Sequence, residues 1–222
     1  MMGRARRIKQ CAVLGLGRFG TSLAKTLYSM GHEVLAVDID ESVVAAIANE
    51  VTYAVQADAT DEQALRDLGI RNVDIAVVSV GLLEQSVMAT LILKEMGVPC
   101  IVCKAVSETH GTVLEKLGAD KVVFPERDMG FRVAHNLISG NLIDYLELVP
   151  GYSIIETKAH TEFFHRTLGE IDLRAKHGIN VIAVKRNKDV FATPGADFRF
   201  EPGDVLIAMG PDEKLGKIED PQ

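Results

Sequence analysis

A glycine-rich hexapeptide is the part of the sequence that most directly suggests a chemistry. Residues 15–20 read Gly-Leu-Gly-Arg-Phe-Gly, a spacing typical of loops that hold nucleotide phosphates. Gly15 permits a tight turn, Gly17 lets the backbone approach a phosphate, and Gly20 lets the following helix pack close to a sheet. The first amides of that helix and its dipole favour a bound anion.

Two side chains inside this loop are expected to take part. Arg18 falls in the first turn of the predicted helix, where a cation opposes the helix dipole. A bound phosphate would reverse that penalty, so we expect Arg18 to be a phosphate ligand. The alternative is an exposed arginine without a role. Phe19, which opens the apolar face of the helix, is included in the predicted site.

An acidic residue ends the next apolar segment. Residues 33–38 read Glu-Val-Leu-Ala-Val-Asp, which places Asp38 at the end of a predicted strand with Ile39 beside it. A carboxylate there accepts hydrogen bonds from ribose hydroxyls. It would repel a 2′-phosphate, so NADP is disfavoured. The alternative for Asp38 is a helix N-cap, a role that suits Asp40 better.

Further polar segments follow later predicted strands, and we expect them to line a nucleotide-binding crevice together with residues 15–20 and Asp38. Asp58 is expected to face the adenine or ribose, and Thr60 is expected to form a capping box with Gln63 for the next helix. Gly81 ends a Ser-Val-Gly segment that permits close approach of a ligand. The nucleotide contacts predicted in these later segments are Asp58, Ala59, Thr60, Ser79, Val80, Gly81, Lys104 and Glu126.

Other residue types give no convincing reactive site. Cys100 and Cys103 are spaced as C-x-x-C, but residues three apart on a strand point to opposite faces, so core packing is expected. The 6 histidines are scattered without metal-ligand spacing. No nucleophile with a matching base can be assembled. A nucleotide-binding fold without a catalytic constellation suggests a sensor whose ligand biases a conformational equilibrium.

Short apolar segments and helical patterns alternate through the first half of the chain. The apolar segments are 10–15, 33–38, 53–56, 74–79, 100–104 and 121–124. Continuous apolarity is typical of strands covered on both faces. Helical patterns between them cover 19–30, a segment from Thr60 to about Gly69, 84–96 and 108–117. This alternation predicts an α/β fold with a doubly wound parallel Rossmann sheet.

The pattern changes near residue 128. Asp128 is expected to cap a long helix from Met129 to about Asp144, and Val149-Pro-Gly151 breaks the chain. Beyond it we expect strands, a turn at 201–204 and a short helix that starts with a Thr167–Glu170 capping box and ends at Gly178. The predicted domains are a nucleotide-binding domain (8–128), a crossover helix and linker (129–149) and a small α+β domain (150–222).

Composition excludes several classes of protein. The chain has 222 residues, 47% of them hydrophobic, and a formal charge of −7, which disfavours a nucleic-acid partner. No apolar run approaches the roughly 18 residues that span a bilayer, and no signal peptide is evident. Its 3 cysteines suit a reducing compartment. We therefore expect a cytoplasmic protein that binds no nucleic acid.

Taken together, these motifs resemble the RCK (regulator of K⁺ conductance) subunits of Ktr and Trk potassium uptake systems. The segments that carry the resemblance are 12–20, 31–38, 58–61, 117–120 and 125–130, then 170–174, 178–184 and 202–206. The Ktr type, with one RCK unit per chain, is closest. One departure is Ala57, where many relatives have glycine.

The resemblance implies a regulatory subunit rather than an enzyme. It implies a homo-oligomeric ring, typically an octamer, on the cytoplasmic face of a transmembrane potassium-translocating subunit. ATP and ADP would occupy residues 15–20 and switch the shape of the ring, with NAD or NADH as the alternative ligand. The matching Glu126 would help hold Mg²⁺ or Ca²⁺ beside the phosphates.

A second ligand site is implied by the same resemblance. Several Ktr-type C-terminal domains bind cyclic di-AMP in a two-fold cleft, which here would be lined by Asp172, Arg174, Asn180, Val181 and Pro194. Arg174 suits phosphate geometry, although it could be an ordinary arginine late in its helix. The rival functions are an NAD-dependent oxidoreductase and a redox-sensing transcription factor, for which no DNA-binding element is found.

Overall fold

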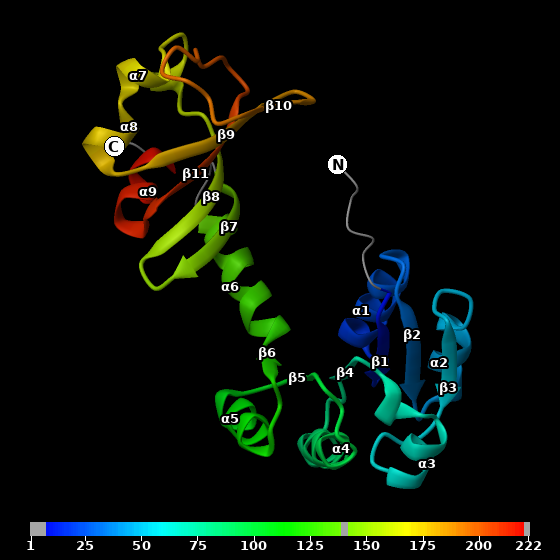
Figure 1. Ribbon diagram of the computed structural model, residues 1–222. Helices are drawn as coiled ribbons and strands as arrows, with labels where there is room; N and C mark the ends of the chain where they lie inside the picture. Colours follow the sequence, from blue (N-terminus) through cyan, green and yellow to red (C-terminus); the bar gives the residue numbers. More distant parts are fainter. Residues whose placement is uncertain (1–7, 139–141, 220–222) are drawn as a thin grey trace. The chain divides into compact units, whose positions relative to one another are not determined.

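The computed structural model describes residues 8–138 and 142–219. The chain divides into two compact units, the first ending at Glu126 and the second beginning at Arg127. Figure 1 shows both units. No helix within the described ranges is long and apolar enough to cross a membrane.

The first unit is built on a parallel sheet with the strand order β3-β2-β1-β4-β5-β6. The strands are β1 (Gln10–Leu14), β2 (Glu33–Asp38), β3 (Tyr53–Gln56), β4 (Ile75–Val78), β5 (Ile101–Lys104) and β6 (Lys121–Val123). Every pair in this sheet is parallel. The predicted doubly wound Rossmann sheet is therefore confirmed, and its order reverses between β1 and β4.

Helices cover both faces of this sheet. They are α1 (Arg18–Ser29), α2 (Glu41–Ile47), α3 (Glu62–Asp67), η1 (Ile70–Asn72), α4 (Leu83–Glu95) and α5 (Glu108–Leu117). On one face, Leu65, Leu93 and Leu114 bring α3, α4 and α5 into a common core. On the other, Ala24 and Ile47 anchor α1 and α2. Burial on both faces explains why the strands are continuously apolar.

Two helix starts in this unit test the expectations about capping. Asp40 is the N-cap of α2, as expected, and accepts a hydrogen bond from the amide of Ser42. The expected capping box of Thr60 and Gln63 is wrong, because Asp61 is the N-cap of α3 and accepts from the amides of Gln63 and Ala64. Asp is a stronger N-cap than Thr, and it stands one residue later.

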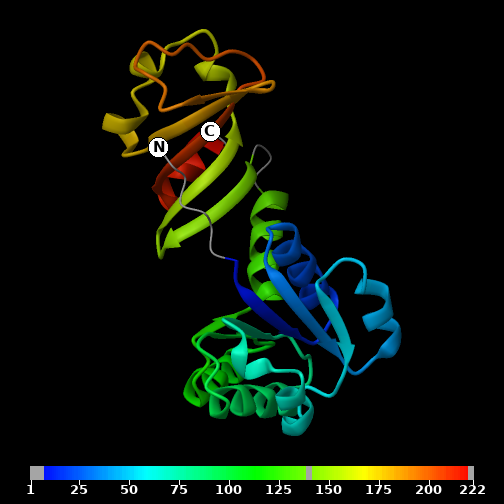
Figure 2. The same ribbon diagram turned by 45° about the vertical axis from the view of Figure 1, so that its right-hand side comes forward.

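The second unit carries an antiparallel sheet with the order β10-β9-β11-β8-β7 (Figure 2). Its strands are β7 (Leu142–Val149), β8 (Tyr152–Lys158), β9 (Asn180–Arg186), β10 (Asp189–Ala192) and β11 (Val205–Pro211). Its helices are α6 (Pro125–Ile138), whose first two residues belong to the first unit, then η2 (Thr161–Phe163), α7 (Leu168–Ile171), α8 (Leu173–His177) and α9 (Asp212–Glu219). Ile155, Phe200, Leu206 and Leu215 lie in its core. This small α+β architecture confirms the predicted fold class.

The long helix expected from Met129 to about Asp144, with Asp128 as its cap, is wrong at both ends, and Asp128 lies inside the helix. Helix α6 starts at Pro125 and ends at Ile138, and proline suits the first helical position because its missing amide would be unsatisfied there. Residues 142–149 instead form the edge strand β7, which pairs with β8. Within β7, Tyr145 is buried in the core of the unit, whereas Leu146, Leu148 and Val149 are exposed.

A left-handed residue splits the short helix expected to end at Gly178. Thr167 and Glu170 do form the expected capping box. Asp172, however, has φ 57° and ends α7, and its carboxylate accepts from the amide of Ala175 as the N-cap of α8. Arg174 is consequently the second residue of α8, not a residue late in one longer helix.

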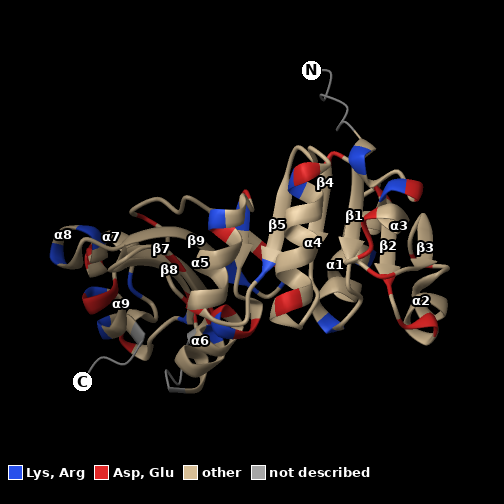
Figure 3. Cartoon of the chain, turned by 90° about the horizontal axis from the view of Figure 1, so that it is seen from below, with Lys and Arg blue, Asp and Glu red and all other residues tan. Residues whose placement is uncertain are grey.

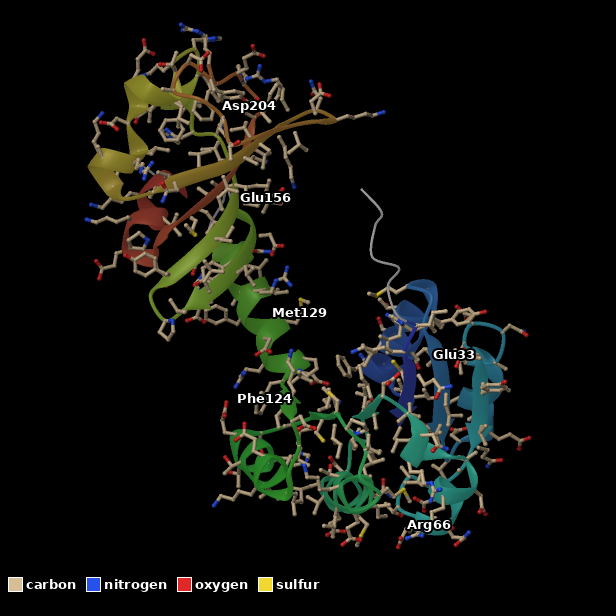
Figure 4. All side chains as sticks on the ribbon, in the orientation of Figure 1. Glu33, Arg66, Phe124, Met129, Glu156 and Asp204 are labelled. Carbon is tan, nitrogen blue, oxygen red and sulfur yellow. The ribbon has the colours of Figure 1, made fainter. Side chains whose placement is uncertain are left out.

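A buried ion pair closes the last turn of the second unit. Asp204, labelled in Figure 4, is fully buried and accepts hydrogen bonds from Arg186 at 2.7 and 2.8 Å. The same carboxylate accepts from the amide of Glu201 at 2.9 Å. Since both carboxylate oxygens have donors, the burial cost of this charge is offset within the turn.

Candidate nucleotide site

The glycine loop after β1 is shaped by two glycines that leave no room for a side chain. Gly15 has φ 93°, and a Cβ there would lie 2.9 Å from the amide nitrogen of Val80. A Cβ on Gly20 would lie 2.0 Å from the carbonyl oxygen of Gly15. Gly17 differs, since a Cβ there would meet nothing within 4 Å. The open approach expected over Gly17 is therefore present.

The first turn of α1 is ready to receive an anion. Gly17 is the N-cap and supplies no side-chain hydrogen bond, and the turn contains no acidic residue. The amides at the start of a helix have no partners within the helix and carry partial positive charge. Arg18 is the first residue of α1 and its side chain is exposed. Phe19, which follows it, is partly exposed.

Asp38 ties the end of β2 to this loop. One carboxylate oxygen accepts a hydrogen bond from the amide of Leu16 at 2.5 Å, and the other accepts from Asp40 at 2.9 Å. Each oxygen keeps a further lone pair. Asp38 therefore positions the loop and still offers an acceptor to a ligand hydroxyl, a double role that the sequence did not reveal.

A shallow hollow of 60 Å³ lies at the carboxyl ends of the central strands. It is lined by Gly15, Val37, Asp38, Ile39, Ala57, Asp58, Ala59, Thr60, Val80 and Gln85. Seven of these residues are among those singled out from the sequence. Gln85 on α4 was missed, because a glutamine on a surface helix looks like any solvated residue. The hollow lies where the strand order reverses, the usual ligand position in such sheets.

Asp58 and Thr60 form a tight local turn at one wall of the hollow. The carboxylate of Asp58 accepts from the hydroxyl of Thr60 at 2.7 Å and from its amide at 2.8 Å. These hydrogen bonds hold the pKa of Asp58 below its ordinary value. Asp58 therefore has a local structural role in this turn as well as a place at the wall of the hollow.

Ser79 faces the loop rather than the hollow. Its hydroxyl donates to the carbonyl of Gly15 at 3.0 Å, and the residue is 5% exposed. Ser79 thus fixes the loop against the end of β4, next to Val80, which lines the hollow. Gly81 is exposed in open space, where an added Cβ would meet nothing within 4 Å.

Lys104 and Glu126 form an ion pair outside the hollow. The Lys104 ammonium donates to the Glu126 carboxylate at 3.0 Å, and this hydrogen bond lowers the pKa of Glu126. Glu126 offers a single carboxylate, and no group of three His, Cys, Asp or Glu residues able to hold a metal occurs within the described residues. The role of Glu126 in holding a divalent cation stays a prediction.

A second hollow, of 290 Å³, lies in the second unit between α7, α8 and β9. It is lined by Leu168, Gly169, Asp172, Leu173, Arg174, Ile179, Asn180, Val181, Pro194 and Ala196. All five residues expected at a second ligand site are among them. Arg174 is exposed at this hollow, whereas Asn180 and Val181 are partly buried.

Comparison with known proteins identifies both halves of the chain. The TrkA-N domain model matches residues 11–125 and the TrkA-C domain model matches residues 153–221. The chain is 45% identical over 212 residues to Ktr system potassium uptake protein C of Bacillus subtilis (strain 168), covering 95% of this chain and 96% of the relative. The chain belongs to the family of Ktr potassium uptake proteins. The resemblance seen in the sequence is thereby confirmed.

This member of the Ktr family is also similar to a second Ktr protein and to a solved channel structure. It is 42% identical to Ktr system potassium uptake protein A of the same organism, with 98% of each chain covered. A structure described as GsuK bound to ADP is 27% identical with a TM-score of 0.51, covering 59% of this chain and 34% of that one. Both Ktr relatives carry names of transport proteins, in agreement with the expectation that the chain is not an enzyme.

Proposed function

We propose that this chain is the regulatory subunit of a potassium uptake system and that adenine nucleotide binding at residues 15–20 controls it. The observation that carries the proposal is the similarity to two Ktr potassium uptake proteins over 95% and 98% of the chain. Its partner is a transmembrane potassium-translocating subunit. The subunit acts at the cytoplasmic side as a homo-oligomeric ring, typically an octamer.

The geometry of the first unit supports a nucleotide ligand. The open backbone at Gly17 and the uncapped start of α1 suit a phosphate. The Asp38 carboxylate has lone pairs left for ribose hydroxyls and lines the shallow hollow. Arg18 adds a cation that favours a polyphosphate. ATP or ADP is therefore the proposed ligand, in keeping with the ADP named for the GsuK structure, and NAD or NADH is the alternative.

Regulation requires the ligand to distinguish two states of the protein. A nucleotide shifts a conformational equilibrium only by its difference in affinity for the two states. ATP and ADP differ by the γ-phosphate, and the residues that would respond to this difference are those at the start of α1. These residues are Gly17, Arg18 and Phe19. Replacing ATP with ADP would therefore alter the contacts of α1 before those of other elements.

A second regulatory ligand is proposed for the second unit. Cyclic di-AMP carries two phosphates and has two-fold symmetry, and the five residues expected to contact it gather at one hollow. One Arg174 from each of two copies would meet the two phosphates. Val181 and Pro194 would supply apolar walls for the bases.

Calorimetric titration of the full chain with ATP, ADP, NADH and NADP tests the nucleotide assignment. We expect ATP and ADP to bind and NADP to bind poorly. Arg18→Ala should weaken ATP at least about tenfold, a loss of about 1.4 kcal/mol, and leave adenosine unchanged. Lys25→Ala is the matched control, since Lys25 lies on the same helix and pairs with Glu50 at 2.7 Å.

Potassium uptake by cells that co-express the chain and its membrane subunit tests the regulatory role. Deleting the chain should abolish the nucleotide dependence of uptake. Gly17→Arg, which would fill the open approach to the loop, should do the same without deleting the subunit. Nucleotide-independent uptake in the wild type, or steady turnover of NADH with a small alcohol or hydroxy acid, would contradict the proposal.

A further inference from the structure

The second unit contains another cavity, separate from the two hollows described above. It has a volume of 630 Å³, within the range of small-molecule sites. Its lining residues come from η2, α7, α8, α9 and the loop at Arg166: Glu162, Phe163, Arg166, Ile171, Leu173, Lys176, His177, Gly216, Lys217 and Ile218. Only Leu173 also lines the hollow at Arg174.

The floor of this cavity is apolar and is part of the core of the second unit. Phe163, Ile171, Leu173 and Ile218 are each no more than 8% exposed and belong to the core of the unit. Gly216 stands at the rim on α9, and a Cβ there would meet nothing within 4 Å. An apolar group could therefore rest against the floor without displacing a side chain.

The rim carries a local excess of positive charge. Arg166, Lys176 and Lys217 are exposed cations, and among the described lining residues Glu162 is the one carboxylate. This sign contrasts with the formal charge of −7 on the whole chain. Figure 3 shows basic residues in blue on α8, in the second unit.

The hydrogen bonds of these cations go to backbone carbonyls in the part of the chain that the structure describes. Among the described residues, none of the three forms an ion pair. The Lys176 ammonium donates to the carbonyl of Ile171 at 2.9 Å, and Arg166 donates to the carbonyls of Glu162 and Glu170. Carbonyl partners orient the side chains but leave their charge available to an anion.

The nearby carboxylate of Glu170 is occupied elsewhere. It accepts a hydrogen bond from the amide of Thr167 at 2.7 Å in the capping box. Hydrogen bonds from Thr167 are the main cause of its lowered pKa, with smaller contributions from Arg199 and Arg166. Glu170 does not line the cavity, so it leaves the rim positive.

From these observations we infer that the cavity binds a phosphomonoester that carries an apolar or aromatic group. Three cations around one opening match a phosphate dianion better than a single carboxylate, and the Arg166 guanidinium suits phosphate geometry. The floor would receive the apolar group, which gains by leaving water. Glu162 at the rim opposes additional negative charge and so selects a single phosphate over a polyphosphate.

Methyl NMR on the full-length chain tests this site directly. With labelled Ile and Leu methyl groups, phenyl phosphate should shift the signals of Ile171, Leu173 and Ile218 in a saturable manner. Phenyl phosphate should bind at least tenfold more tightly than inorganic phosphate, because only it uses the floor. Equal affinity of the two, or absence of saturable shifts at these methyls, would overturn the inference.

Charge reversal on α9 provides the matched pair of variants. Lys217→Glu should weaken phenyl phosphate at least tenfold, while Lys214→Glu, a lysine of the same helix outside the cavity lining, should leave the affinity within twofold. Arg174→Gln should also have no effect, since Arg174 lines the other hollow. An unaltered affinity in Lys217→Glu, with the methyl spectrum otherwise intact, would remove the cation rim from the site.

Two probes distinguish the sources of such a ligand. AMP represents a free nucleoside monophosphate, and dihexanoyl phosphatidic acid represents a lipid headgroup with short chains. Tighter binding of AMP, judged from the Ile171 methyl and not from signals near Gly17, would assign a soluble metabolite. Tighter binding of the phosphatidic acid would assign a lipid phosphate. If AMP, the phosphatidic acid and phenyl phosphate all fail to bind, the cavity is not a ligand site.

Discussion

The carboxylate of Asp38 accepts a hydrogen bond from the amide of Leu16 across 2.5 Å, which joins the end of β2 to the glycine loop after β1. Its second oxygen holds the amide of Asp40 at 2.9 Å. The segments that follow β1 and β2 are thus both held by the carboxylate of Asp38. The same carboxylate lines the hollow at the carboxyl ends of the strands, so loop position and ligand contact depend on one side chain.

Asp38→Asn is expected to change both nucleotide affinity and ligand choice. The amide side chain keeps one acceptor, so the free energy of unfolding should fall by about 1 kcal/mol. ADP affinity should fall about tenfold because the charged acceptor for ribose is lost. The ratio of NADP to NAD affinity should rise, since repulsion of the 2′-phosphate is relieved. Calorimetry with these three nucleotides measures the effect.

Asp40→Asn is the control for this substitution. Asp40 is the N-cap of α2 and does not line the hollow. Asn caps helices as well as Asp, so stability and nucleotide affinity should both remain near those of the wild type. If Asp38→Asn behaves like Asp40→Asn, the carboxylate of Asp38 does not contact the nucleotide.

Substitutions of two loop glycines should distinguish an effect on protein stability from an effect on ligand binding. Gly20→Ala should destabilise the first unit by about 1–3 kcal/mol, because its Cβ would collide with the carbonyl of Gly15. Gly17→Ala has room for its Cβ and an ordinary φ of −61°. It should therefore unfold like the wild type yet bind ATP more weakly. Urea unfolding and ATP titration of both variants check this contrast, and a large loss of stability in Gly17→Ala would contradict it.

The first unit could be predicted from the sequence because its signals are local. Buried parallel strands are continuously apolar, and the glycine spacing marks the turn from β1 into α1. What the sequence could not show are hydrogen bonds between segments far apart, such as Ser79 to the carbonyl of Gly15. The contribution of Gln85 to the hollow depends likewise on how α4 packs against the sheet.

The second unit was harder to predict for two physical reasons. The strand β7 lies at the edge of its sheet, where it pairs with β8 alone, and its apolar residues Leu146, Leu148 and Val149 are exposed. Its sequence therefore lacks the alternation that marks a half-buried strand, and its first residues look like the end of the preceding helix. The left-handed Asp172 divides α7 from α8, although a non-glycine residue with positive φ is uncommon. Helix α9 at the end of the chain was not expected, and it is anchored by Leu215 in the core.

Glu126 is expected to matter for divalent cations rather than for stability. The hydrogen bond from Lys104 lowers its pKa, so the stabilising pair is present above the ordinary pKa of Glu and is lost as pH falls through the lowered value. Since the Glu126 side chain is 67% exposed, Glu126→Gln should hardly change the melting temperature at pH 7. It should remove the extra stabilisation that Mg²⁺ adds to the ATP-bound protein.

A neighbouring carboxylate provides the comparison for Glu126. Asp128 lies on the same helix and pairs with Arg127 at 2.9 Å, so Asp128→Asn should retain the Mg²⁺ effect. Because one copy offers a single carboxylate, the effect should also require the oligomer and disappear in a dissociated chain. Thermal unfolding with ATP, with and without Mg²⁺, tests the Asp128→Asn control and the need for the oligomer. An unchanged Mg²⁺ effect in Glu126→Gln would exclude this residue from the cation site.

Arg174 provides the test of the second ligand. It is exposed at the hollow lined by Asn180, Val181 and Pro194, and Arg174→Ala should weaken cyclic di-AMP at least tenfold, as expected when a charge-assisted contact to phosphate is lost. Lys176→Ala, on the same short helix but outside that hollow, should bind normally. Calorimetry on the full chain should also give one cyclic di-AMP per two copies, because each phosphate needs an arginine from a different copy. No binding at micromolar concentrations to a chain shown to be dimeric would leave the second unit with a role in assembly alone.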